Sequence, residues 1–367
     1  MTLIAGFAEP VGTQGYARRA QDGGKVSPDH FSRAPGDLRL SSLGLGTYLG
    51  APDGATDLAV EQTVNVCVRS GRVNVIDTAI NYRYQRAERS VGRALRRAIE
   101  AGHTARNEVF VATKNGYLAP DAESGLGGEE WIRQELVHPG VLRPSEIVEG
   151  NVATPRYLAD QFERSRANLG LETIDLLYLH NTTDAQLPSL GRTAFRAVLR
   201  DAFRLFEQLR RDGRLRYYGL ATWDSLRAPR ADSGYWSLEE TVEIATEVGG
   251  DDHGCRFVQF PFNASMPEAA VLRNQTVQSE RLSLFDAARR LGFGCFTNVP
   301  LLQGQLAREG PRYDDLSAAE SALQLARSAP GTIGPLVGQK QPEHVAENLA
   351  VCARPRWNDA RFRTALA

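Results

Sequence analysis

The chain has 367 residues, 42% of them hydrophobic and 24% charged, which is typical of a globular protein with one large domain or two ordinary ones. Its 43 basic and 44 acidic residues leave a formal net charge of -1, so composition gives no basis for binding nucleic acid or an anionic membrane. No apolar run approaches the length of a membrane span and no signal-peptide pattern opens the chain, so we expect a cytoplasmic protein. The four cysteines form no C-x-x-C pair, and Cys67 and Cys295 stand in apolar stretches typical of buried thiols.

Short apolar runs without polar alternation recur from residue 40 onward, as is typical of strands covered by helices. They predict strands over residues 40–46, 73–77, 108–114, 173–180, 216–222, 256–262, 293–299 and 332–338. Amphipathic helical patterns lie between and after them, over 59–71, 86–102, 156–170, 193–213, 237–250, 279–292, 317–328 and 341–353.

Eight strands alternating with eight helices predict an α/β fold of the (β/α)8 TIM-barrel type. A doubly wound open sheet alternates in the same way. Its first turn would carry G-x-G-x-x-G, whereas LGLGTYLG places its glycines at Gly44, Gly46 and Gly50, which is a different spacing. The count of eight units favours the barrel.

Two segments exceed what a barrel needs. Residues 1–39 are rich in Gly, Pro and polar residues, and we expect an arm or a plug at the barrel base. Residues 116–156 form a long insertion after the third strand, which should overhang the active-site mouth because it follows a strand end. The predicted organisation is an N-terminal arm over 1–39, a barrel over 40–353 that contains the insertion, and a C-terminal tail over 354–367.

Four polar residues stand at or just after the carboxyl ends of consecutive predicted strands: Asp77, Tyr82, Lys114 and His180. In a parallel barrel this end carries the active site. A lysine ammonium beside a phenol stabilises the phenolate, so Lys114 should lower the pKa of Tyr82, and Asp77 should keep Lys114 charged. His180 could polarise a substrate carbonyl, so the four groups together predict an acid relay with a small oxyanion site.

Each of these residues also has an ordinary structural explanation. Asp77 and Lys114 could form a structural ion pair, His180 could be a satisfied core residue and Tyr82 could be plain packing. The convergence of all four at adjacent strand ends favours the functional interpretation. No second histidine or acidic partner stands at ligand spacing from His180, so no metal site is expected.

These motifs resemble those of the aldo-keto reductase family. DTAINY matches the family's Asp-Thr-Ala, two residues, then Tyr, and ERSVGRAL, ATK and DLLYLH match the segments that carry its Glu and Gly, its Lys and its His. Downstream, GRLRYYGLATW, FVQFPFN, VPLLQGQL and EHVAEN resemble further family segments, so the resemblance runs from about Leu40 to Val351.

The resemblance implies an NAD(P)H-dependent oxidoreductase that reduces an aldehyde or ketone, or oxidises the corresponding alcohol. Tyr82 would be the general acid/base, tuned by Asp77 and Lys114, and His180 would orient the carbonyl. Gln259 would contact the nicotinamide carboxamide. The cofactor would be held by Thr47, Thr222, Gln259, Pro300, Leu301, Gln303, Gly338, Gln339, Lys340, His344, Glu347 and Asn348.

The chain departs from the family pattern at three cofactor positions. Ala221 and Thr222 stand where the family has Ser-Asn, Asn298 replaces the aromatic residue that stacks on the nicotinamide, and His344 replaces the Arg that grips the 2′-phosphate. Lys340 could replace that charge, although not the bidentate fork of arginine. We expect NADP as the cofactor, with NAD left open.

The residues expected at the substrate are Tyr48, Tyr117, Trp131, Asn181 and Trp223. Aromatic residues of the insertion suggest a wide pocket under a lid, but Trp131 could equally pack the insertion onto the barrel. The polar residues after His180, such as Asp184, are more simply explained as residues of a polar surface loop than as substrate contacts. The competing hypothesis is a catalytically vestigial, cofactor-binding sensor or regulatory subunit. Neither the carbonyl or alcohol substrate nor the oligomeric state follows from the sequence.

Overall fold

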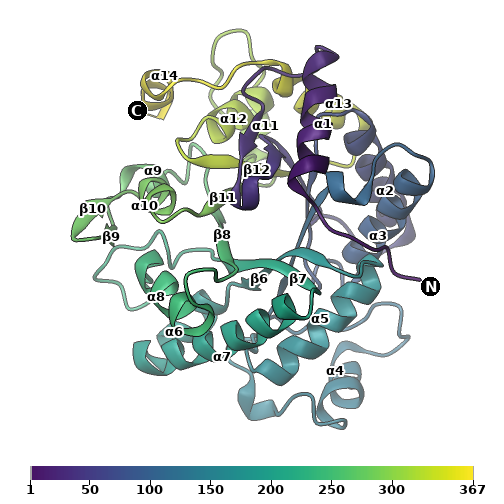
Figure 1. Cartoon of the computed structure of the whole chain (residues 1–367), viewed down its shortest axis with the longest axis vertical. Helices are drawn as coiled ribbons and strands as arrows, with labels where there is room; N and C mark the ends of the chain where they lie inside the picture. Colours follow the sequence, from purple (N-terminus) through teal and green to yellow (C-terminus); the bar gives the residue numbers. More distant parts are fainter. Residues whose placement is uncertain (1, 367) are drawn as a thin grey trace.

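The computed structural model describes residues 2–366 and shows a closed barrel of eight parallel strands (Figure 1). The strands close in the order β11-β12-β3-β4-β5-β6-β7-β8. Their bounds are β3 (Gly44–Gly46), β4 (Val75–Asp77), β5 (Phe110–Asn115), β6 (Ile174–His180), β7 (Leu215–Ala221), β8 (Cys255–Pro261), β11 (Gly294–Asn298) and β12 (Thr332–Gly338). The prediction of an eight-stranded parallel barrel is confirmed.

Helices follow each barrel strand and cover its outer side. They are α2 (Gly54–Arg69), α3 (Arg86–Glu100), α5 (Pro155–Leu169), α7 (Arg192–Arg211), α8 (Leu238–Gly249), α10 (Leu284–Arg290), α12 (Ala318–Arg327) and α13 (Pro342–Ala350). The start of α12 has a capping box, in which Ser317 and Glu320 bond each other's backbone amides. Gly170 ends α5 in the left-handed conformation that glycine adopts without steric cost.

The helix predicted over 279–292 is wrong in its first part. Residues 280–282 instead form β10 (Glu280–Leu282), which pairs with β9 (Gln275–Val277) in a hairpin. The helix α10 begins only at Leu284. Ser283 accepts a hydrogen bond from the Asp286 amide, which fixes the helix start at that point.

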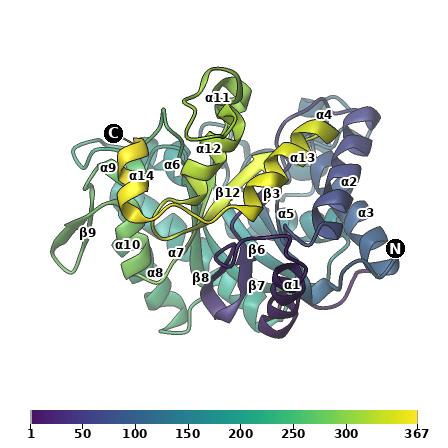
Figure 2. The same cartoon turned by 90° about the horizontal axis from the view of Figure 1, so that it is seen from above.

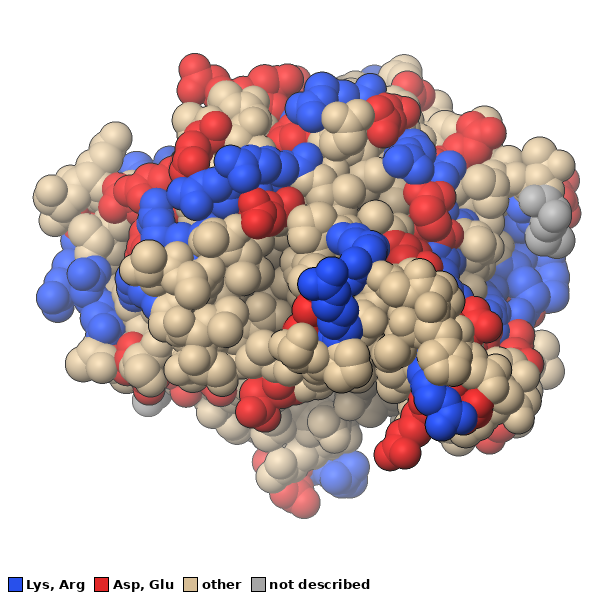
Figure 3. Space-filling view, turned by 90° about the horizontal axis from the view of Figure 1, so that it is seen from below, with Lys and Arg blue, Asp and Glu red and all other residues tan. Residues whose placement is uncertain are grey.

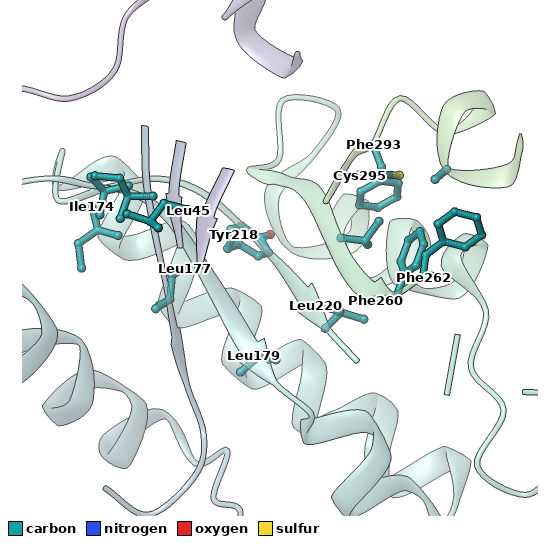
Figure 4. Close-up of a cluster of buried hydrophobic side chains, with 14 of the residues drawn as sticks. Leu45, Ile174, Leu177, Leu179, Tyr218, Leu220, Phe260, Phe262, Phe293 and Cys295 are labelled. Atoms are coloured by element: carbon teal, nitrogen blue, oxygen red, sulfur yellow. The ribbon is translucent and has the colours of Figure 1, made fainter. Parts of the chain in front are cut away.

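Alternate strand residues face two separate apolar clusters. Leu177 and Leu179 of β6 face outward toward the helices, in the large cluster partly drawn in Figure 4. Leu176 and Tyr178 face inward with Phe257 and other strand residues, and fill the barrel. Side chains alternate between the two sides of a strand, so the positions that point inward along each strand also determine which polar residues at its end point into the barrel.

The N-terminal segment packs against the amino-terminal end of the barrel. It contains α1 (Pro10–Asp22) and an antiparallel hairpin of β1 (Phe31–Arg33) and β2 (Arg39–Ser41). Leu38 and Leu40 join the cluster that fills the barrel interior. Figure 2 shows α1 at one end of the barrel and α4, α6 and α11 at the other.

The single strand predicted over 40–46 is wrong, because these residues belong to two strands. β2 pairs antiparallel with β1 under the barrel, whereas β3 pairs parallel with β4 and β12. The change of partner occurs at Ser42, whose amide donates to the carbonyl of His30. Apolar periodicity does not reveal such a change of partner.

Residues between β5 and α5 form a small substructure with its own apolar cluster. It contains α4 (Gly128–Ile132), a π-helical turn over Arg133–Val137 and a 3-10 turn over Pro144–Glu146. Trp131, Leu136, Leu142 and Val152 are buried together against Tyr157 of α5.

The remaining elements are short helices and 3-10 turns in the loops and at the C-terminus. They are α6 (Thr182–Leu190), α9 (Glu268–Val271), α11 (Gln305–Glu309), α14 (Asp359–Leu366) and 3-10 turns over Pro35–Asp37, Arg106–Glu108, Leu302–Gly304 and Val351–Ala353. No helix in residues 2–366 is long and apolar enough to cross a membrane. On the face drawn in Figure 3, acidic and basic side chains are interspersed.

Candidate active site

Three of the four predicted catalytic residues lie at the carboxyl ends of neighbouring strands, Lys114 being the last residue but one of its strand, and their side chains point into the barrel. Asp77 lies two residues after the inward Val75, Lys114 two after Ala112, and His180 two after Tyr178. Strands β4, β5 and β6 are hydrogen-bonded neighbours, so these side chains are brought to one edge of the barrel lumen.

Lys114 and Asp77 form a buried ion pair. Lys114 Nζ lies 2.5 Å from Asp77 Oδ2 and 2.9 Å from the carbonyl oxygen of Thr78, to which it donates. Burial lowers the pKa of Lys114, but the Asp77 carboxylate and the Tyr82 oxygen more than offset this, and the pKa ends above its usual value. Burial raises the pKa of Asp77, while the Lys114 ammonium opposes that rise. Lys114 is therefore charged at neutral pH.

Tyr82 lies on the loop between β4 and α3, above the lysine. Lys114 Nζ is 4.8 Å from the centroid of the Tyr82 ring. Burial raises the pKa of Tyr82 above its usual value, and Lys114 only partly opposes the shift. Lys114 thus acts on the Tyr82 pKa in the predicted direction, but desolvation outweighs the attraction of the ammonium, so the predicted net lowering does not occur in the free protein.

His180 completes the cluster as a neutral imidazole. Its ring centroid lies 5.7 Å from that of Tyr82, in an edge-to-face arrangement. Burial lowers the pKa of His180 well below its usual value, and the nearby Lys114 charge acts in the same direction. Its buried Nδ1 has no hydrogen-bond partner among the described residues. A neutral imidazole can donate one hydrogen bond to an incoming oxygen.

Aromatic side chains flank this cluster. The Tyr48 ring lies 5.0 Å from Tyr82 and the Tyr117 ring 5.1 Å from His180. Tyr48 is 57% exposed and Trp223 is 40% exposed. Asn181 Nδ2 lies 3.4 Å from the Tyr117 hydroxyl, to which it donates.

Trp131 does not belong to this group. It is only 3% exposed, lies in the separate cluster of the insertion, and has the Arg164 guanidinium 5.1 Å from its ring centroid. The structure therefore supports the packing alternative for Trp131, which corrects its assignment to the substrate.

Three buried oxygen atoms at the ends of adjacent strands lack hydrogen-bond partners within residues 2–366. They are Thr222 Oγ1 after β7, Gln259 Oε1 on β8 and Asn298 Oδ1 at the end of β11. Buried polar atoms are nearly always paired, so this row of acceptors has the character of a ligand site. An amide group such as a nicotinamide carboxamide, with two N–H donors, fits this set.

A narrow cleft lies on the other side of the strand ends, between β3, β12 and α2. Thr47, Gly338, Gln339 and Lys340 line it, together with Leu45, Gly46, Leu49, Val60 and Thr63. Lys340 Nζ crosses the cleft and donates to the carbonyl of Leu49 at 2.8 Å. Burial lowers the pKa of Lys340, and Arg83 adds to this shift.

The residues predicted to hold the adenosine are partly engaged with one another. Asn348 Nδ2 donates to Gln339 Oε1 at 2.7 Å, and Gln339 Nε2 donates to Cys67 Sγ at 3.2 Å. Glu347 accepts from the hydroxyl of Ser317 at 2.6 Å. His344 is exposed on α13, Pro300 is buried, and Leu301 and Gln303 lie in the turn after β11.

Two further residues shape the site: Asn151, which no sequence motif singles out, and Asp184, which was expected to be a plain surface-loop residue. Asn151 of the insertion donates to the carbonyl of His180 at 2.9 Å. Asp184 accepts from the backbone amides of Trp223, Asp224 and Ser225 at 2.7 to 2.9 Å, which fixes the turn after β7. The spacing of neither residue carried a signal for these roles, because each partner is distant in sequence.

Comparisons with known proteins agree with this architecture. The sequence model of the Aldo/keto reductase family matches residues 42–246. An uncharacterized oxidoreductase of Bacillus subtilis (strain 168), YqkF, is 22% identical over 332 residues, which cover 89% of this chain and 92% of that protein.

Solved aldo-keto reductases have the same fold. One from Bacillus halodurans, in its holo form, has a TM-score of 0.60 at 19% identity and covers 92% of this chain and 94% of its own. One from Klebsiella pneumoniae, in complex with NADP and acetate, has a TM-score of 0.58 at 16% identity with the same coverage of both chains. With the family match spanning more than half of its residues, the chain belongs to the aldo/keto reductase family.

Proposed function

We propose that this protein catalyses the NAD(P)H-dependent reduction of an aldehyde or ketone, or the reverse oxidation of an alcohol, with Tyr82 as the general acid/base. The observation that carries the proposal is the contact between the Tyr82 ring and Lys114 Nζ, 4.8 Å apart, with Asp77 paired to the same ammonium. A protonated phenol beside a fixed cation is suited to giving up a proton during a reaction.

The raised pKa of Tyr82 keeps it protonated at neutral pH, so it can donate its proton to a carbonyl oxygen. Proton transfer leaves a phenolate, and the Lys114 ammonium stabilises that negative charge. Neutral His180 donates a hydrogen bond to the same carbonyl oxygen and orients it. The two donors together would stabilise the negative charge that develops on this oxygen.

The cofactor would lie across the strand ends, and when bound it supplies the hydride. Thr222, Gln259 and Asn298 would hold the carboxamide through their unpartnered oxygens. Lys340 would release the Leu49 carbonyl and meet a phosphate of the cofactor. NADP is favoured because the Klebsiella pneumoniae relative is described in complex with NADP, and the retained charge of Lys340 is compatible with a 2′-phosphate. NAD stays an alternative, because His344 lacks the fork of arginine.

The substrate would carry a flat or apolar group next to its carbonyl. Tyr48, Tyr117 and the exposed Trp223 would contact that group, while Tyr82 and His180 hold the oxygen. Aromatic and short aliphatic aldehydes and ketones are the first panel to test.

The decisive experiment is Tyr82→Phe, measured as the loss of nicotinamide absorbance in single-turnover mixing with that panel. We expect the rate to fall by at least about 100-fold, in line with general acid catalysis, while the dissociation constant of NADPH stays within twofold. Reduction by the variant at the wild-type rate contradicts the assignment of the acid. Cofactor binding by the wild-type protein without turnover of any compound would favour a sensor instead.

A further inference from the structure

The loop that carries Tyr82 ends in an unusual backbone segment. Arg83, Tyr84 and Gln85 have φ angles of 49°, 55° and 73°, so three consecutive residues other than glycine adopt the left-handed conformation. α3 begins at the next residue, Arg86. Such residues are individually uncommon and energetically unfavourable, and they persist where the surrounding structure holds them.

The buried side chain of Arg83 anchors the first residue of this left-handed segment. Its side chain is 1% exposed, and its Nη1 atom lies 2.5 Å from Asp57 Oδ1 on α2. Its Nη2 atom donates to the hydroxyl of Ser90 at 3.2 Å. The residue next to the proposed general acid is therefore fixed by a buried ion pair to another helix.

The side chain of Gln85 anchors the third residue of the left-handed segment. Its side-chain Nε2 donates to the carbonyl of Ala119 in the insertion at 2.8 Å, and its Oε1 accepts from Asn168 of α5 at 3.1 Å. Tyr84, between the two anchors, accepts through its carbonyl from the amide of Ala122, and its side chain is 52% exposed.

Tyr82 has little else to fix its downstream side. Its amide donates to the carbonyl of Ala79 and its carbonyl accepts from the amide of Ala87 in α3, and both bonds lie within the same loop and helix start. Tyr82 is on a loop, unlike Asp77, Lys114 and His180, which are fixed by the barrel ladder. The position of its ring over Lys114 thus depends on how the loop is anchored.

We propose that Arg83 is a positioning residue for Tyr82, acting through its buried ion pair with Asp57, which holds the left-handed segment 83–85 and thereby keeps the phenol over Lys114. This inference rests on the proposed function for its kinetic consequence only. The position of the Tyr82 ring can be measured without turnover.

The test compares Arg83→Met, Arg83→Lys and Asp57→Asn with Arg106→Met as a matched control. Arg106 forms a similarly buried ion pair, 2.7 Å from Asp175 Oδ2 with side chains 5% and 1% exposed, but Asp175 lies near the amino-terminal end of β6. Loss of this ion pair should lower the melting temperature without affecting the active site. In each variant we would measure the melting temperature, the NADPH dissociation constant, kcat and KM. The 19F resonance of 3-fluorotyrosine introduced at position 82 would report on the ring in the cofactor-free protein.

We expect Arg83→Met and Asp57→Asn to lower kcat by at least about tenfold, with the NADPH dissociation constant unchanged within twofold, and to shift or broaden the 19F resonance. Arg83→Lys, which keeps the charge, should recover part of kcat and of the spectrum. Arg106→Met should keep kcat within twofold and the spectrum of the wild-type protein.

A folded Arg83→Met protein with wild-type kcat and an unchanged 19F resonance overturns the proposal. If Arg83→Met does not fold, a wild-type resonance in both Arg83→Lys and Asp57→Asn overturns it equally. If the wild-type protein reduces no carbonyl compound, the proposed function fails, and the 19F comparison still decides whether Arg83 positions the Tyr82 ring.

Discussion

Lys114 Nζ lies 2.5 Å from Asp77 Oδ2, and the two residues stand at the ends of strands that are hydrogen-bonded neighbours in the barrel. Both side chains are almost fully buried, at 1% and 5% exposure. The pair therefore lies in the barrel lumen, away from water, where its charges are poorly screened. The second carboxylate oxygen of the aspartate, Asp77 Oδ1, has no hydrogen-bond partner among the described residues.

Replacing Lys114 with Met should impair both stability and catalysis. Removing one member of a buried ion pair leaves an uncompensated charge and costs about 3–5 kcal/mol in the free energy of unfolding. We expect that loss in urea denaturation, and a kcat reduced by at least about 100-fold because the Tyr82 phenolate loses its cation. The Asp77→Asn/Lys114→Met double variant should regain stability but not activity. If kcat recovers with stability, Lys114 has only a structural role.

Replacing Asp184 with Ala should weaken ligand binding more than the chemical step. Three backbone amides, those of Trp223, Asp224 and Ser225, lose their shared acceptor, so the turn after β7 loosens. We expect KM or the NADPH dissociation constant to rise about fivefold or more, and stability to fall by about 1–3 kcal/mol. Asp184→Asn keeps one acceptor oxygen, so its effects on binding and stability should lie between those of Asp184→Ala and the wild-type protein. Unchanged binding by a folded Asp184→Ala protein contradicts a role for this turn in the site.

His30 should make the protein less stable in acid. Its Nε2 donates to the carbonyl of Arg72 at 2.7 Å, and its Nδ1 accepts from the hydroxyl of Ser42 at 2.8 Å. Arg327 donates to the same hydroxyl oxygen at 2.8 Å, so the hydroxyl proton must point at His30. Burial, reinforced by the Arg327 charge, lowers the pKa of His30 to about 3.

Because the unfolded state binds a proton at about pH 6.5 and the folded state only near pH 3, the contribution of His30 is fully present above pH 6.5 and is lost as the pH falls. The slope should be about 1.4 kcal/mol per pH unit for this one group. His180 and His253 have the same direction of shift and add to the wild-type slope. Urea unfolding at several pH values between 6 and 4 should show a smaller slope for His30→Gln. An identical slope in both proteins rules out His30 as a source of acid sensitivity.

Gly36 should be intolerant of a side chain. It has a φ of 70°, and a Cβ atom there would lie 1.9 Å from the Tyr217 hydroxyl. We expect Gly36→Ala to lower the free energy of unfolding by about 2 kcal/mol or more, from left-handed strain plus the clash. The Gly36→Ala/Tyr217→Phe double variant should recover part of the loss. Both should keep wild-type kcat, because the hairpin lies at the opposite end of the barrel from Tyr82. A Gly36→Ala protein as stable as wild type refutes this account of the packing.

The sequence by itself determined the barrel and its polar strand ends. Eight apolar runs separated by amphipathic helices, without the glycine spacing of a doubly wound sheet, favoured the barrel, and seven of the eight barrel strands begin and end within about three residues of the prediction. Asp77, Lys114 and His180 could be placed because each ends an apolar run, and a parallel barrel collects those ends on one side.

Only the tertiary structure decided what depends on contacts between distant segments. The change of strand partner at Ser42, the packing of Trp131 in the insertion's own cluster and the hydrogen bonds from the turn after β7 to Asp184 depend on which segments meet in space. Asp184 and Asp224, for example, are 40 residues apart in the sequence. The direction of the Tyr82 pKa shift was decided in the same way, because it is the balance of desolvation against one cation 4.8 Å from the ring. Periodicity reports which side of an element is buried. It does not report which distant groups meet there, and those distances set the electrostatics of the site.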